Sequence, residues 1–96
     1  MITMASTREQ IHSSLICQID RMELLVAGKP RLSEFGRIAL ANVFLQLRKE
    51  ALRSTPDSAI VHESLATWNA ITGEEFLAER LQREFDKLSA AWQPER

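Results

Sequence analysis

The sequence predicts an all-α protein: a small bundle of three to four helices, completed by dimerisation. Apolar residues recur at steps of three and four along most of the chain, which is the period of amphipathic helices. Helix start and stop signals divide the chain into segments of helical length, and glycine and proline occur only three times each. At 96 residues we expect one domain, with disordered ends at 1–5 and 93–96.

The first helix is expected over about residues 7–27. Ser6 and Glu9 form a capping-box pattern, in which each side chain bonds the backbone amide of the other residue. Gly28 offers a left-handed stop, and Pro30 prevents continuation. The apolar residues between these signals share one face: Ile11, Leu15, Ile19, Met22 and Val26.

The second helix is expected to begin after Ser33, which can cap it. From about residue 38 to 47 most of its circumference is apolar, so it has to be covered on several sides. Val43, Phe44 and Leu47 are predicted to be core residues. One subunit supplies only three other helical segments with a single apolar stripe each, and a homodimer is therefore predicted.

Thr55 is the predicted cap of the third helix, with Pro56 in its first turn. Thr72 and Glu75 form a second capping-box pattern around Gly73, which predicts a kink or short break between two helical segments. The last segment repeats the spacing of the first helix along one face: Leu77, Leu81, Phe85, Leu88 and Trp92.

The sequence contains no recognisable motif of catalysis or metal binding. His62 and Glu63 could begin a zinc-protease motif, but Ala66 stands where the second histidine is required. Cys17 is the lone cysteine and is interpreted as a core or interface residue. There is no glycine-rich phosphate loop. We therefore expect neither an enzyme, nor a cofactor, nor a bound metal.

Charge and apolar runs give no sign of a membrane. The 12 basic and 13 acidic side chains leave a net charge of −1, so no overall field attracts nucleic acid or anionic lipid. The longest apolar run, residues 38–47, is far shorter than the roughly 20 residues that span a bilayer. With one cysteine and no visible export signal, the expected location is the cytoplasm.

A local excess of positive charge lies between residues 29 and 53. A nucleic-acid-binding transcriptional regulator is therefore an alternative, although the cations divide between the two ends of a largely buried helix. The segment 57–71, a possible recognition helix, contains no lysine or arginine, so nucleic acid is not the expected partner. The residues of this alternative are Arg31, Arg37, Arg48, Lys49 and Arg53.

Elimination leaves a small intracellular regulator that binds another protein, for example an inhibitor or anti-activator that occupies a partner's interaction or dimerisation surface. An accessory subunit or chaperone is the remaining alternative. Large aromatic side chains dominate many protein interfaces, which places the predicted partner surface on the last two helical segments. Its residues are Trp68, Phe76, Leu77 and Trp92, with Trp68 left open between core and interface.

Overall fold

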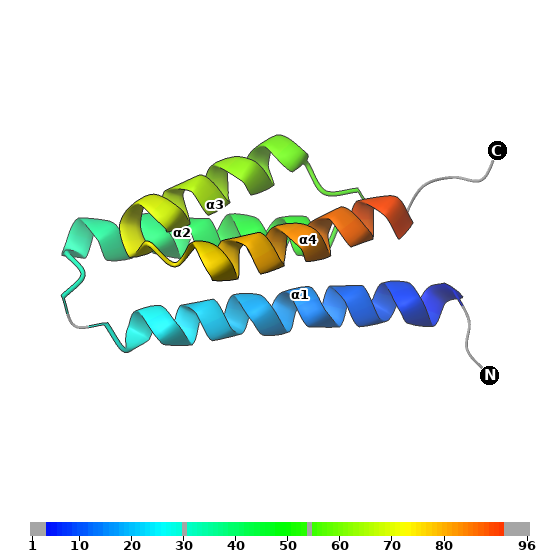
Figure 1. Ribbon diagram of the computed structural model, residues 1–96, viewed down its shortest axis with the longest axis horizontal. Coiled ribbons are helices and arrows are strands. Elements are labelled where there is room, and N and C mark those ends of the chain that lie inside the picture. The colour runs from blue at the N-terminus through cyan, green and yellow to red at the C-terminus, as the bar shows by residue number, and fades with distance from the viewer. Residues whose placement is uncertain (1–3, 30, 54, 92–96) are drawn as a thin grey trace.

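The computed structural model describes residues 4–29, 31–53 and 55–91, with side chains from residue 9 to residue 90 except at the two gaps. The described chain is all-helical, as the sequence predicted, and successive helices run in opposite directions (Figure 1). The start of α1 and the end of α4 consequently lie at the same end of the bundle. The four helices are α1 (Met4–Ala27), α2 (Glu34–Ala51), α3 (Ser58–Thr72) and α4 (Glu75–Ala91).

The helices form a closed ring around one core. α1 packs beside α2 and α4, and α3 packs beside the same two helices, so each helix has two close neighbours. Every helix contributes its apolar stripe to the interior, which is the arrangement expected of an antiparallel four-helix bundle. The innermost side chains, fully buried, include Leu15, Ile19, Leu40, Leu47, Trp68, Leu81 and Leu88.

The predicted core residues of α2 are confirmed. Val43, Phe44 and Leu47 are all buried. The Phe44 ring meets Trp68 of α3 edge-on, with ring centroids 6.0 Å apart, a geometry that aromatic pairs favour.

The predicted start of the first helix needs correction, and its predicted end is formed differently than expected. The helix begins at Met4, so Ser6 lies inside α1 and is not its N-cap. Methionine and alanine are good helix formers, so Met4 and Ala5 extend the helix ahead of Ser6. The other end is placed correctly, but Gly28 does not use the left-handed conformation, since Gly73 is the one residue with positive φ in the part of the chain described.

Capping explains where α2 and α3 begin. The Ser33 hydroxyl accepts the Gly36 amide at 3.0 Å, which confirms the predicted cap of α2. The predicted Thr55 cap of α3 is wrong: Asp57 is the N-cap, and its carboxylate accepts the Ala59 amide at 3.0 Å. The reason lies in α2, where the buried Glu50 carboxylate accepts the Asp57 amide at 2.7 Å and keeps the preceding segment out of the helix.

Of the kink or short break predicted around Gly73, the structure has the break: α3 ends at Thr72, α4 begins at Glu75, and the chain reverses between them. Gly73 has φ 74°, and its amide donates to the Asn69 carbonyl at 2.9 Å, a left-handed helix end that glycine adopts without strain. The Thr72 hydroxyl accepts the Glu74 amide at 3.1 Å, and not that of Glu75. The Trp68 indole donates to the Glu74 carbonyl at 2.9 Å and so joins the turn to the core.

The enclosure of Phe44 predicts a large loss of stability when its ring is removed. Phe44→Ala should lower the free energy of unfolding by about 3–5 kcal/mol, because the lost contacts leave a cavity between α2 and α3. Urea unfolding followed by circular dichroism measures this. The matched control is Phe76→Ala on the exposed side of α4, which should cost less than about 1 kcal/mol. Equal losses would contradict the burial of Phe44.

The role of Glu50 predicts that its oxygen acceptor matters more than its charge. Glu50→Leu should cost about 1–3 kcal/mol, because the Asp57 amide loses its acceptor. Glu50→Gln should cost less, since the amide oxygen can still accept that bond. The same unfolding measurement on both variants compares them, and an equal loss would show that the hydrogen bond is not what stabilises the α2–α3 connection.

Candidate protein-binding surface

α2 carries large apolar side chains on the side turned away from the core. Phe35, Ile38, Leu45 and Leu52 are between 56% and 81% exposed. These four residues account for most of the large exposed apolar side chains among the described residues; the others are Leu24, Leu25 and Phe76. Exposed apolar side chains gathered on one element are typical of interaction sites.

Helical geometry places three of these residues in one row. Ile38, Leu45 and Leu52 are seven residues apart, close to two helical turns, so they lie nearly above one another. The exposed Ala41 lies between the first two. We call this row, Ile38, Ala41, Leu45 and Leu52, the outer face of α2. Spacing of this kind occurs where one helix packs along another.

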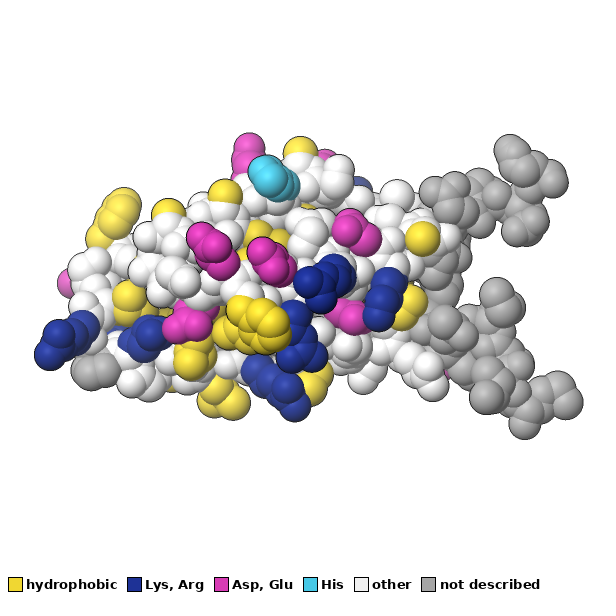
Figure 2. All heavy atoms as spheres, viewed as in Figure 1, with side chains coloured by type: hydrophobic (Ala, Val, Ile, Leu, Met, Phe, Trp, Pro, Cys, Tyr) yellow, Lys and Arg dark blue, Asp and Glu magenta, His cyan; other side chains and the backbone are white. Residues whose placement is uncertain are grey.

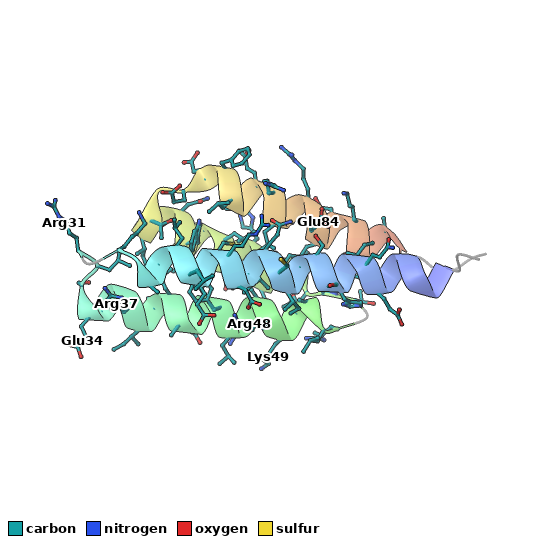
Figure 3. All side chains as sticks on the ribbon, turned by 90° about the horizontal axis from the view of Figure 1, so that it is seen from below. Arg31, Glu34, Arg37, Arg48, Lys49 and Glu84 are labelled. Atoms are coloured by element: carbon teal, nitrogen blue, oxygen red, sulfur yellow. The ribbon has the colours of Figure 1, made fainter. Side chains whose placement is uncertain are left out.

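One border of the outer face consists of ion pairs to α1. Arg48 donates to Asp20 at 2.6 Å and to Glu23 at 2.5 Å, so it joins α2 to α1 (Figure 3). The hydrogen bond to Asp20 and then that to Glu23 raise the pKa of Arg48 above its ordinary value. The guanidinium therefore stays charged, and this border remains polar.

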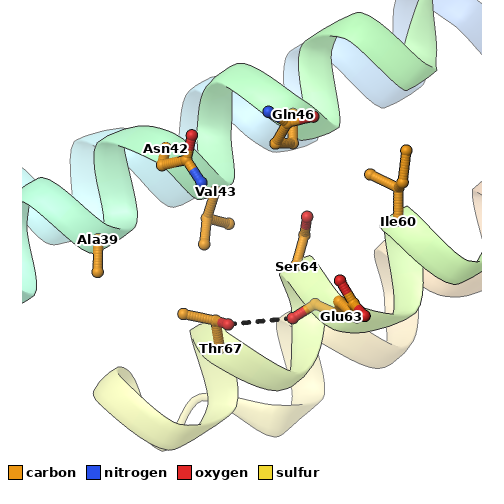
Figure 4. Close-up of a pocket in the computed structure, with 8 residues that line it drawn as sticks. All are labelled: Ala39, Asn42, Val43, Gln46, Ile60, Glu63, Ser64 and Thr67. Atoms are coloured by element: carbon orange, nitrogen blue, oxygen red, sulfur yellow. Dashed lines mark hydrogen bonds between the residues drawn. The ribbon is translucent and has the colours of Figure 1, made fainter.

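The opposite border is a cleft of about 470 Å³ between α2 and α3, in which polar side chains alternate with the apolar Ala39, Val43 and Ile60 (Figure 4). Asn42 and Gln46 line it from α2, and Ser64 and Thr67 line it from α3, where the Thr67 hydroxyl donates to the Glu63 carbonyl at 3.1 Å. The cleft offers amide, hydroxyl and carboxylate groups for hydrogen bonds. An apolar row between two polar borders is the usual anatomy of a protein interface.

The structure does not bring the predicted partner residues together on one surface. The sequence left Trp68 open between core and interface. Its side chain is fully buried, so Trp68 is a core residue. Leu77 is partly buried against the core, whereas Phe76 is exposed, with the Arg80 guanidinium 5.8 Å from its ring centre. Trp92 lies outside the described residues.

The face formed by α1 and α4 differs from the outer face of α2. Figure 2 shows its apolar side chains in separate patches among basic and acidic ones. Phe76 on α4 belongs to such a mixed surface, because Arg80 packs over its ring. The outer face of α2 was therefore not among the predicted partner residues, although the apolar circumference of the second helix indicates it.

The five basic residues of the nucleic-acid alternative do not form one free patch. Arg48 is paired with carboxylates of α1, and Arg53 lies 3.3 Å from the Glu50 carboxylate. Arg37 donates to the Lys29 carbonyl, while Arg31 and Lys49 are exposed near opposite ends of α2 (Figure 3). Phosphate binding requires several cations on one face, and this arrangement supplies few.

The described side chains that could bind a metal or act in catalysis do not gather at one site. Within the described ranges no cluster of three or more His, Cys, Asp or Glu side chains could hold a metal ion. Cys17 is exposed on α1, whereas the His12 ring contacts the Ala51 carbonyl through Nδ1 at 2.5 Å and thereby joins α1 to the end of α2. None of the four described helices is both long and apolar enough to span a bilayer.

Fold and surface together define the class: an antiparallel four-helix bundle whose second helix is apolar on two opposite faces. Comparison of the chain with protein-family profiles, with curated proteins and with solved structures finds no match.

The two faces of α2 predict losses of stability of very different size for Leu47 and Leu45. Leu47→Ser should cost more than about 3 kcal/mol of stability, because it removes buried apolar atoms and buries a hydroxyl. Leu45→Ser should cost less than about 1 kcal/mol, because Leu45 points into solvent. Thermal unfolding of both variants at low protein concentration measures the difference. A strongly destabilised Leu45→Ser chain would contradict the outward orientation of this residue.

Proposed function

We propose that this chain is a small intracellular regulatory protein that acts by binding another protein, with the outer face of α2 as its binding surface. The observation that carries the proposal is the row of exposed apolar side chains at Ile38, Leu45 and Leu52. The row runs from Ile38 within α2 to Leu52, the residue that follows the helix, and its three large side chains are each more than half exposed.

The geometry favours a helix as the binding element. Residues spaced by seven along a straight helix present a narrow apolar row, which a second amphipathic helix can cover along its length. If the partner dimerises through one of its own helices, that helix can pack on α2 instead, and binding of this chain then prevents the partner from dimerising. The proposed regulator is therefore an inhibitor or anti-activator that occupies a partner's interaction or dimerisation surface.

The same face supports the homodimer proposed from the sequence. A helix with two neighbours in a ring of four buries the side turned to the core, and the described part of the chain leaves the apolar row of α2 uncovered. A second copy presents an identical row, and two identical surfaces can cover each other about a two-fold axis.

Affinity capture from the source organism, with mass spectrometry, tests the function. The unchanged chain should retain a specific protein, and Leu45→Ser should retain much less of it, because apolar contact on the outer face is lost. Phe76→Ser is the matched control, since it changes an exposed apolar residue on α4 and leaves α2 intact.

Retention of the same protein by Leu45→Ser, together with its loss in Phe76→Ser, would place the binding surface on α4 and contradict the proposal. Circular dichroism of both variants shows whether each remains folded.

A further inference from the structure

Two unpaired charges of opposite sign lie on the outward side of α2. Glu34 is in the first turn and Lys49 in the last, both are exposed, and both point away from the other helices (Figure 3). Neither takes part in an ion pair within the described chain, whereas Arg48 and Arg53 are already matched with carboxylates. Glu34 thus places an exposed negative charge near the start of α2 and Lys49 an exposed positive charge near its end, while Arg37, close to the start, donates to the Lys29 carbonyl.

This distribution decides the relative direction of two copies. If two α2 helices pair in parallel, Glu34 faces Glu34 and Lys49 faces Lys49, and both contacts are repulsive. If they pair antiparallel, each Glu34 approaches the Lys49 of the second copy, and the two helix dipoles oppose each other favourably.

Two members of the apolar row, Ile38 and Leu45, fit the same register, whereas Leu52 lies beyond the paired segment. An axis midway between Glu34 and Lys49 passes between Ala41 and Asn42, and the midpoint of Ile38 and Leu45 falls at the same place. One two-fold axis therefore matches both the charged and the apolar pair. The short Ala41 side chain at the crossing point allows the two backbones to approach closely.

We infer that two copies of this chain associate through an antiparallel pair of α2 helices, with a two-fold axis beside Ala41 and Asn42. Ile38 of each copy packs against Leu45 of the other, and Glu34 of each pairs with Lys49 of the other. This inference rests on the outer face that the proposed function uses, and it names one occupant of that face and the geometry of its binding.

Charge exchange tests the pairing by sedimentation equilibrium. Glu34→Lys and Lys49→Glu should each raise the dimer Kd at least about threefold, because symmetry places two like-charge contacts in every dimer. The double variant should return to within about twofold of the unchanged chain. In the double variant, each end of α2 carries the charge that its helix dipole disfavours. If the two charges acted only within one chain, the double variant should therefore be worse than either single variant, not restored.

Cysteine cross-linking in a Cys17→Ser background tests direction and register. Ala41→Cys should form an intermolecular disulfide readily, because the axis places the two thiols near each other. Leu52→Cys should not, since antiparallel pairing puts these residues at opposite ends of the interface. The exposed Glu79→Cys on α4 is the control for random collision.

The outcomes separate this inference from the proposed function. Efficient cross-linking of Leu52→Cys indicates parallel pairing and overturns the inference, and so does a chain that stays monomeric at micromolar concentration. Neither result affects capture of another protein by the unchanged chain and its loss in Leu45→Ser, on which the proposed function depends. Failure of that capture experiment, with cross-linking at Ala41→Cys intact, would overturn the proposed function alone.

Discussion

Burial of the inner side of α2 is the interaction on which the rest of the structure depends. Leu40, Phe44 and Leu47 fill the centre of the ring, and α1 and α3 pack along the two flanks of α2. A helix in a ring of four can turn only one side to the core. Among the described residues, the other helices therefore leave the opposite side of α2 uncovered, and the outer face is a consequence of the bundle itself.

Polar contacts determine where the helices end. The buried Glu50 holds the Asp57 amide, the Trp68 indole holds the Glu74 carbonyl, and the His12 ring contacts the Ala51 carbonyl. Each contact joins a backbone group at a helix end or turn to a side chain of the bundle, so the backbone group stays satisfied as the chain reverses. The α2–α3 and α3–α4 connections are thus each joined by a hydrogen bond to a side chain of the helix that precedes them.

Much of the fold could be predicted from the spacing of apolar residues, because a helix that packs by one stripe repeats every three to four positions. This spacing gave the helices and core residues such as Phe44. Capping was less predictable, because Thr55 and Asp57 are both good N-caps and a contact from Glu50 decides between them. The site was harder still, since a tryptophan suits an interface and a core equally well, and packing against Phe44 places Trp68 in the core.

The sequence by itself determined that the chain is helical, that its second helix is apolar around most of its circumference, and that His62 and Cys17 stand apart from any recognisable catalytic motif. These properties follow from composition and period, which are local. Only the tertiary structure decided which side of α2 faces the core, that Gly73 reverses the chain, and that Arg48 and Arg53 are matched by carboxylates. Those outcomes depend on residues far apart in the chain, whose contacts exist only after the four helices have packed.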